Sequence, residues 1–291
     1  MKHLFKISQT IVSFTAFLLL IACNGNPIST QKNESKQTVY EKILESKTIH
    51  VGYISYPPSL IKDPNSDKYS GIFYEVLTEM GRNLDLKIDF VEEVTWGNMI
   101  EEVNTGKVDL VCTGIWPNSS RGKLADFTNP IYYSPVKAYV KEGNTNFDGD
   151  LSKINSEKVK ISVIDGEMTS IIAKYDFPLA KLSGLTQSSD VSQVLLDVAS
   201  NKAEITFVEP FVANAYMDKN KNTIREVANV NPLRVFPNVM MVAKGEEKFL
   251  SMLNISIDEL ANNGFTEKAI KKYELYPNSF YRRQIPYILN H

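Results

Sequence analysis

Apolar residues in the first half of the chain alternate between two spacings. Short runs rich in β-branched residues span Thr48 to Tyr53, Leu86 to Val91 and Val108 to Thr113, and such runs predict strands. Between these runs, apolar residues recur every three or four positions, as on one face of a helix: Phe73, Val76, Leu77, Met80 and Leu84, then Trp96, Met99, Ile100 and Val103. Gly106 follows as a helix stop. The order strand, helix, strand, helix, strand indicates a parallel sheet covered by helices.

The second half of the chain repeats this organisation without repeating the sequence. Predicted strands span Val159 to Ile164, Ile205 to Val208 and Val239 to Ala243. The predicted helices are, in chain order, Thr169 to Tyr175, a segment with apolar Val191, Val194, Leu195 and Val198, then Glu246 to Asn262 with Gly264 as its stop, and Thr266 to Tyr276. The simplest layout is two α/β lobes with a late return of the chain to the first.

The N-terminal segment has the composition of a secretory signal. Lys2 and Lys6 come first, and an apolar run follows from Ile7 to Ala22. The run ends Leu20-Ile21-Ala22-Cys23, which resembles the lipobox of bacterial lipoproteins, where the cysteine is lipidated and becomes the first residue. We therefore expect a signal peptide over residues 1–22 and an anchor at Cys23, palmitate included, on the extracytoplasmic side of a bacterial membrane. The alternatives are an ordinary signal with a chance cysteine, or a membrane helix.

Residues 24–38 are almost all polar, with glycine and proline, and cannot bury enough apolar surface to order themselves. Residues 23–38 are therefore predicted to be the lipidated cysteine and a flexible tether. If Cys23 is lipidated, only Cys112 remains, and no intrachain disulfide can form. Cys112 lies in an apolar run and is predicted to be a buried, small hydrophobic residue.

Composition and charge exclude several classes of protein. The chain is 43% hydrophobic and 23% charged, as in globular proteins, and its formal net charge is −2 with acidic and basic residues interspersed. No basic patch suited to a phosphate backbone is visible, so nucleic acid is not an expected partner. The histidines are His3, His50 and His291, and the sequence shows no Ser-His-Asp set, metal-ligand cluster or phosphate loop. We expect no metal or cofactor.

Several short motifs occur in a fixed order over more than two hundred residues. They are Tyr56-Pro57-Pro58, Gly71, Trp96, Gly106 to Leu110, Gly114 with Arg121 seven residues later, Asp126 to Tyr133, and Asn254 to Gly264. Together they resemble the extracellular amino-acid-binding proteins of ABC transporters, which form family 3 of the bacterial extracellular solute-binding proteins. The resemblance covers nearly the whole chain after Cys23 and implies a binding protein, not an enzyme.

The resemblance implies a periplasmic-binding-protein-like (type II) α/β fold. Each of its two lobes has a mostly parallel sheet flanked by helices, and two hinge crossings join the lobes. We place the crossings near Tyr132 to Pro135 and Phe236 to Val239, so that lobe 1 comprises residues 39–134 and 239–291 and lobe 2 residues 135–238. A monomer of this kind holds a small solute in the interlobe cleft, closes by hinge motion and delivers the solute to an ABC transporter permease.

The same resemblance assigns roles to individual cleft residues. Arg121 matches the arginine that grips the α-carboxylate of the solute, since a planar guanidinium binds a carboxylate through paired donors. Glu209 matches an acid that accepts hydrogen bonds from the α-ammonium, and it is also a favourable helix-start residue before Pro210. Tyr56 and Trp96 match the aromatic pair that sandwiches the apolar part of the solute. The matches to hydroxyl and main-chain donors are Thr113, Gly114, Met168 and Thr169.

Two of these residues have a second interpretation. Trp96 also begins the apolar stripe of a predicted helix and would then belong to the core. Thr169 would serve equally as the cap of the helix that starts near it.

Three positions depart from the family pattern. Trp116 and Asn118 stand where serine or threonine is common before the arginine, and Glu167 stands where a small hydroxyl residue is common. An indole and an extra carboxylate would reshape the pocket, which favours a larger, modified or cationic amine-bearing solute. The other interpretation of Trp116 is that it points out of the cleft.

Two other functions are compatible with the same fold. A secreted enzyme similar to cyclohexadienyl dehydratases would use a cleft carboxylic acid, and Glu167 or Glu209 would have to serve. A ligand-sensing lipoprotein would use the same pocket to report a solute to a receptor.

Overall fold

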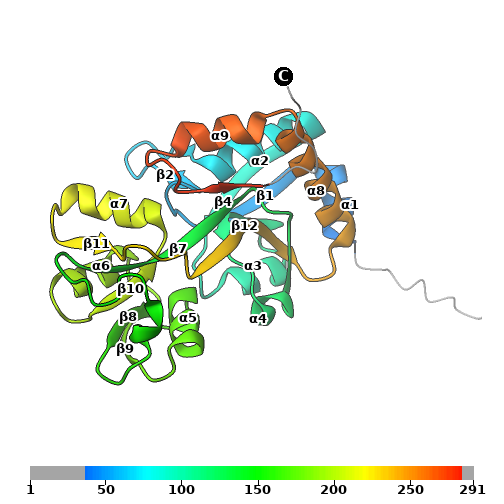
Figure 1. Cartoon of the computed structure of the whole chain (residues 1–291). Coiled ribbons are helices and arrows are strands. Elements are labelled where there is room, and N and C mark those ends of the chain that lie inside the picture. Colours follow the sequence, from blue (N-terminus) through cyan, green and yellow to red (C-terminus); the bar gives the residue numbers. More distant parts are fainter. Residues whose placement is uncertain (1–36, 284–291) are drawn as a thin grey trace, which may run out of the picture. The chain divides into compact units, whose positions relative to one another are not determined.

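The computed structural model describes residues 37–283 (Figure 1). The predicted signal peptide, the predicted lipidation site Cys23 and residues 24–36 of the predicted tether lie outside the described residues. At the end of that tether, Thr38 already has a structural role: its side chain accepts a hydrogen bond from the Glu41 backbone, and Glu41 returns the bond in a capping box that begins helix α1 (Val39–Ser46).

One sheet is built around β1 (Thr48–Tyr53), which lies between β4 (Lys87–Glu93) and β5 (Leu110–Ile115). Both pairings are parallel, as the strand-helix-strand order predicts. Every residue of β5 is buried, because helices cover both faces of the sheet. The smaller strands in this half of the chain are β2 (Ile61–Lys62), β3 (Tyr69–Ser70) and β6 (Ala125–Phe127).

The second sheet has the same local order. Strand β8 (Lys160–Ile164) pairs in parallel with β9 (Lys181–Leu185) on one side and with β10 (Ile205–Val208) on the other. The short strand β11 (Ile224–Glu226) pairs with the neighbouring long strand β7 (Tyr132–Lys141).

Strand β7 and strand β12 (Arg234–Ala243) connect the two sheets (Figure 1). Residues Tyr132 to Val136 of β7 pair antiparallel with Arg234 to Asn238 of β12. Beyond this paired segment the two strands separate. The rest of β7 joins β10 in the second sheet, whereas the rest of β12 joins β5 and β6 in the first. The result is two α/β lobes joined by paired crossing strands. The lobe boundaries given above lie in this segment and stay a prediction.

Helices cover the faces of both sheets and bury separate apolar clusters. In the first lobe, α1, α2 (Ile72–Leu84), α8 (Glu247–Asn262) and α9 (Phe265–Tyr273) pack on one face, and α3 (Met99–Thr105) packs on the other. In the second lobe, α5 (Met168–Asp176) packs on one face, and α6 (Ser192–Ala199) and α7 (Pro210–Lys219) pack on the other. The short helices are α4 (Ser119–Gly122) and η1 (Leu151–Ile154).

The apolar positions of helix α2 stabilise the fold by burial in the core. Its predicted apolar positions Phe73, Val76, Leu77 and Met80 are buried in the first core, and each such side chain contributes about 1.5–3 kcal/mol. Gly71 precedes the helix at a φ of 110°, where a Cβ atom would lie 2.6 Å from the Ser59 carbonyl oxygen. Glycine is required there by both the backbone conformation and the close approach.

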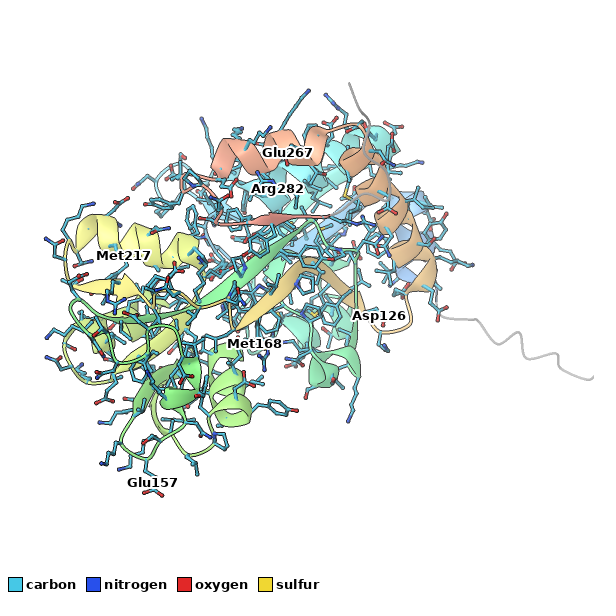
Figure 2. The ribbon with its side chains drawn as sticks, in the orientation of Figure 1. Asp126, Glu157, Met168, Met217, Glu267 and Arg282 are labelled. Carbon is cyan, nitrogen blue, oxygen red and sulfur yellow. The ribbon has the colours of Figure 1, made fainter. Side chains whose placement is uncertain are left out.

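Several predicted boundaries move in the structure. Trp96 lies in the turn before α3, and not in the helix, because α3 begins at Met99. The strand expected from Val108 to Thr113 is β5, two residues later, and the last helix ends at Tyr273 instead of Tyr276. After α9, the strand β13 (Tyr281–Arg282) pairs with β7, and Arg282 forms an ion pair with Glu267 of α9 (Figure 2).

Candidate functional site

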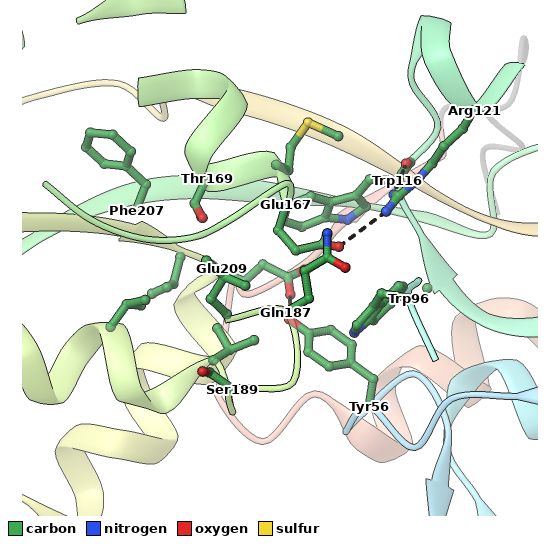
Figure 3. Close-up of a pocket in the computed structure, with 16 residues that line it drawn as sticks. Tyr56, Trp96, Trp116, Arg121, Glu167, Thr169, Gln187, Ser189, Phe207 and Glu209 are labelled. Atoms are coloured by element: carbon green, nitrogen blue, oxygen red, sulfur yellow. Dashed lines mark hydrogen bonds and ion pairs between the residues drawn. The ribbon is translucent and has the colours of Figure 1, made fainter. Parts of the chain in front are cut away.

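A cavity lies where segments of the two lobes meet, at the ends of several strands (Figure 3). Most of the residues that the sequence indicated line it: Tyr56, Trp96, Gly114, Trp116, Arg121, Glu167, Met168, Thr169 and Glu209. Gly114 lies near the end of β5, and the others come from the segments that follow β1, β4, β5, β8 and β10. Because the carboxyl ends of parallel strands meet at one edge, residues far apart in sequence converge there.

Arg121 is held in place by its own loop. Its backbone N–H donates to the Asn118 side chain, which caps α4, at 2.9 Å. Its guanidinium Nη1 donates to the Trp116 carbonyl oxygen at 3.0 Å. Asn118 does not line the cavity, so its place in the structure is that of a residue that positions Arg121.

The second guanidinium nitrogen of Arg121 lies opposite Glu167. Nη2 is 3.5 Å from Glu167 Oε1, and this ion pair crosses the cavity from α4 to the start of α5 (Figure 3). The two side chains are 13% and 22% exposed. An ion pair this sheltered from water is weakly screened and stronger than an exposed one.

Glu209 is the other carboxylate that lines the cavity. It is the N-cap residue of α7 with Pro210 at the first helical position, as its sequence context predicts. The residue is only 5% exposed, and the Tyr56 hydroxyl donates to its Oε2 at 2.6 Å. Burial raises the pKa of Glu209, and hydrogen bonding from Ser134 and Tyr56 opposes part of that rise.

Trp116 points toward the hinge strand β12 and lines the cavity with part of its surface. Its indole stacks on Phe236 at a ring-centroid distance of 4.7 Å, and its Nε1 donates to Asn238 Oδ1 at 3.1 Å. Gly114 leaves the space for this arrangement, since a Cβ atom there would lie 2.7 Å from the oxygens of both Asn238 and Ser59. The interpretation that Trp116 points out of the cleft is wrong.

The aromatic walls are formed by Tyr56 and Trp96, whose rings meet edge to face at a centroid distance of 5.8 Å. Thr169 lines the cavity but does not cap α5, because the helix begins at Met168 and its N-cap residue is Glu167. Thr113 is fully buried and is not a lining residue. The neighbouring Gly114 does line the cavity, although the direction that its Cβ atom would take is filled by Asn238 and Ser59.

Sequence reasoning missed the remaining lining residues: Ile164, Gln187, Ser189, Val191, Val194, Phe207 and Val208. Ile164, Phe207 and Val208 end predicted strands, and the carboxyl-end rule for parallel sheets would have indicated them. Gln187 and Ser189 follow β9, which no pattern predicted. A wider opening shares Tyr56, Trp96 and Gln187 with the cavity and continues along α7 to Lys219, which gives the cavity an outlet to solvent.

Two features that the described residues lack bear on the type of site. No group of three or more His, Cys, Asp or Glu side chains in residues 37–283 is arranged to hold a metal ion. None of the helices in the same residues has the length and apolar character needed to cross a bilayer. The arrangement is a partly buried cavity with one guanidinium, two carboxylates and aromatic walls, which suits the binding of a small charged molecule.

Comparison with known proteins gives the family. Residues 49–275 match the model of the bacterial extracellular solute-binding proteins, family 3. The chain belongs to this family. The prediction made from the motifs between Tyr56 and Gly264 is thereby confirmed, and so is the two-lobed fold class.

Relatives of this solute-binding protein cover most of its length. A probable histidine-binding protein of Campylobacter jejuni is 24% identical over 92% of this chain and 98% of the relative. The probable ABC transporter extracellular-binding protein YckB of Bacillus subtilis is 29% identical over 76% of each chain. The crystal structure of an ancestral amino acid-binding protein, a precursor of cyclohexadienyl dehydratase, has a TM-score of 0.69 at 24% identity and covers 81% of this chain and 99% of its own. The last comparison shows the shared fold.

Proposed function

We propose that this protein is the membrane-anchored solute-binding component of an ABC uptake system. It captures a small polar solute related to an amino acid in the cavity between its lobes and delivers the solute to a permease. The anchor is the lipidated Cys23, which holds the protein on the extracytoplasmic side of a bacterial membrane, and residues 23–38 connect the anchor to the folded lobes.

The observation that carries this proposal is the placement of opposite charges in one cavity. Arg121 follows β5 of the first lobe, and Glu209 follows β10 of the second. Both line the cavity beside the aromatic rings of Tyr56 and Trp96. A solute that contacts groups of both lobes stabilises their closed arrangement, which is how a two-lobed clamp signals that it is loaded.

The relatives support delivery to a permease. The Campylobacter jejuni protein is named for histidine binding, and the Bacillus subtilis protein is named for an ABC transporter. A further relative of Bacillus subtilis, 24% identical over 90% of this chain, is named an L-cystine-binding protein. Their match over most of their own length favours the same type of role here.

The test is a thermal-unfolding screen of residues 23–291 produced with Cys23→Ser. The panel contains amino acids, their amides and their decarboxylated amines. A solute at a hundred times its dissociation constant adds about 2.7 kcal/mol to the free energy of unfolding, which shifts Tm by about 5–11 °C in a chain of this size, at about 2–4 °C per kcal/mol. We expect such a shift from at least one amine-bearing solute.

A pair of matched variants tests whether the solute binds in this cavity. Glu209→Gln should abolish the shift, because the amide carries no charge to meet the ammonium group. Glu157→Gln changes an exposed glutamate at the far end of the second lobe and should leave the shift intact (Figure 2). Absence of any shift across the panel, or equal shifts in both variants, would contradict the proposed function.

A further inference from the structure

We propose that the Glu167 carboxylate occupies the place beside Arg121 that a carboxylate of the solute would otherwise take. The solute is therefore an amine without a free carboxylate. This inference rests on the proposed function and names the class of solute within it. Its basis is the ion pair that crosses the cavity between Arg121 Nη2 and Glu167 Oε1.

Both terminal nitrogens of the Arg121 guanidinium already face acceptors of the protein itself. One end of its guanidinium donates to the Trp116 carbonyl oxygen at 3.0 Å, and the other end faces Glu167 at 3.5 Å. A solute carboxylate that approached Arg121 would meet the Glu167 carboxylate in the same place. Two like charges at such a distance repel each other strongly in a partly buried site.

Glu167 is free to serve Arg121 because the helix behind it does not use its side chain. The residue is the N-cap of α5, where a side-chain oxygen commonly accepts from the first backbone N–H groups, yet its side chain makes no such bond. The carboxylate instead reaches across the cavity from the second lobe to the first (Figure 3).

The charges of the cavity wall give the charge of the solute. The charged lining residues are Arg121, Glu167 and Glu209, so the wall has a net charge of about −1 when all three are ionised. An amino-acid zwitterion would leave that charge unbalanced. A monoamine with one positive charge balances it, and a buried charge is stable only when it is paired.

Glu209 is the partner for this positive charge. In residues 37–283 no ion pair joins Glu209 to a lysine, arginine or histidine, although it is almost completely buried. The Tyr56 hydroxyl donates to Glu209 at 2.6 Å, and the Tyr56 ring contacts Trp96 edge to face. A carboxylate beside aromatic rings is a favourable environment for an ammonium group, through charge pairing and cation–π attraction.

Matched pairs of ligands test the inference on the protein with residues 23–291 and Cys23→Ser. Isothermal titration compares tyramine with tyrosine, histamine with histidine, and phenethylamine with phenylalanine, and it includes lysine and arginine as amino acids with a cationic side chain. We expect at least one amine to bind about tenfold or more tightly than its amino acid. The corresponding amino-acid amides, which keep the size of the solute and lack its negative charge, should behave like the amines.

The variant Glu167→Gln supplies the second arm, because it releases the Arg121 guanidinium without changing the size of the side chain. We expect the ratio of amine to amino-acid affinity to fall by about tenfold or more, since the solute carboxylate can then reach Arg121. The unfolding midpoint of the variant without ligand shows whether it is folded. The amides tested on the unchanged protein provide a result that does not depend on the variant.

Three results would overturn the inference. The first is tighter binding of the amino acid than of its amine in every pair, and the second is an unchanged ratio in Glu167→Gln. The third is tightest binding of lysine or arginine, whose side-chain cation would then be the partner of Glu167. In each case solute binding itself, and with it the proposed function, would stand. Failure of every compound to bind would instead overturn both proposals.

Discussion

The Trp116 indole donates a hydrogen bond to the Asn238 side chain at 3.1 Å, and this bond joins the wall of the cavity to the crossing strand β12. The Asn238 amide in turn donates to the Ser134 hydroxyl of β7 at 2.8 Å. Trp116 therefore contacts one hinge strand directly and the other through a single residue. A solute that contacts the indole therefore contacts a residue that is bonded to the crossing strands.

Replacement of Trp116 by phenylalanine should destabilise the fold. The phenyl ring retains stacking on Phe236, but Asn238, which is 1% exposed, loses a hydrogen-bond donor. A buried acceptor left without a partner costs about 1–3 kcal/mol, which chemical denaturation would detect. Trp96→Phe is the control, because no hydrogen bond from the Trp96 indole is present in the described structure. Equal losses in the two variants would refute this role for the bond.

Gly114→Ala should be markedly more harmful than an alanine substitution at a neighbouring glycine. The new Cβ atom would lie 2.7 Å from Asn238 Oδ1 and from Ser59 Oγ, so the hinge must shift to admit it. Overpacking of this kind costs about 1–3 kcal/mol. Gly122→Ala is the matched control in helix α4, where nothing lies within 4 Å, and it should be neutral or slightly stabilising. Equal unfolding midpoints for Gly114→Ala and Gly122→Ala would contradict this argument from packing.

Glu209 should make the stability of the fold depend on pH in a defined direction. Burial raises its pKa in the folded state, so the folded protein holds this proton more tightly than the unfolded chain does. The contribution of Glu209 to stability therefore grows as pH falls through the folded pKa toward the ordinary value of 4.5, and is lost as pH rises. Without solute, Glu209→Gln should be more stable than the unchanged protein at higher pH. This advantage should shrink as pH falls over the same range.

Glu41 provides a control of opposite sign for that titration. Hydrogen bonding from Thr38 lowers the pKa of Glu41, so its contribution to stability is present above the ordinary value of 4.5 and is lost as pH falls through the folded pKa. The difference between the unchanged protein and Glu41→Gln should thus shrink with falling pH. For each variant, Glu41→Gln and Glu209→Gln, the difference in stability from the unchanged protein is plotted against pH. If the two differences change with pH in the same direction, burial does not control the titration of Glu209.

The proposed lipid anchor at Cys23 is tested by labelling the chain of residues 1–291 in bacteria with radioactive palmitate. We expect incorporation in the unchanged chain and in Cys112→Ser, because Cys112 is buried within β5 and lies far along the chain from the signal. Cys23→Ser should abolish labelling and release the protein from the membrane fraction. Labelling that survives Cys23→Ser would place the lipid elsewhere, and absence of labelling in the unchanged chain would exclude it.

Much of the fold was predictable because its strands and helices have distinct periods. The run from Ile205 to Val208 and the stripe from Phe73 to Leu84 each became the expected element. Helix α7 was not predicted as a segment, since its apolar residues do not follow one clear stripe. Strand β12 extends five residues further toward the N-terminus than predicted, because Arg234 to Asn238 are ordered by pairing with β7 and not by an apolar pattern.

The site was predictable where a motif fixes a residue and unpredictable where only three-dimensional contact does. Arg121 and Glu209 follow predicted strands, and both line the cavity. Gln187 lies in a polar loop, and only the folded chain brings it to the cavity wall. The sequence also showed that Glu167 is unusual, but its pairing with Arg121 depends on the approach of two loops from separate sheets.

The return of β12 to the first sheet makes the order of synthesis matter for this chain. Strand β5 has its hydrogen-bonding edge covered by β12, which is made more than a hundred residues later. Until that later strand arrives, β5 has an open apolar edge of the kind that promotes aggregation. The second sheet, in contrast, obtains all its strands from one continuous stretch between β7 and β11. A chain that ends before residue 234 would therefore have an incomplete first sheet with an exposed, aggregation-prone edge. Its second sheet would still contain all of its strands.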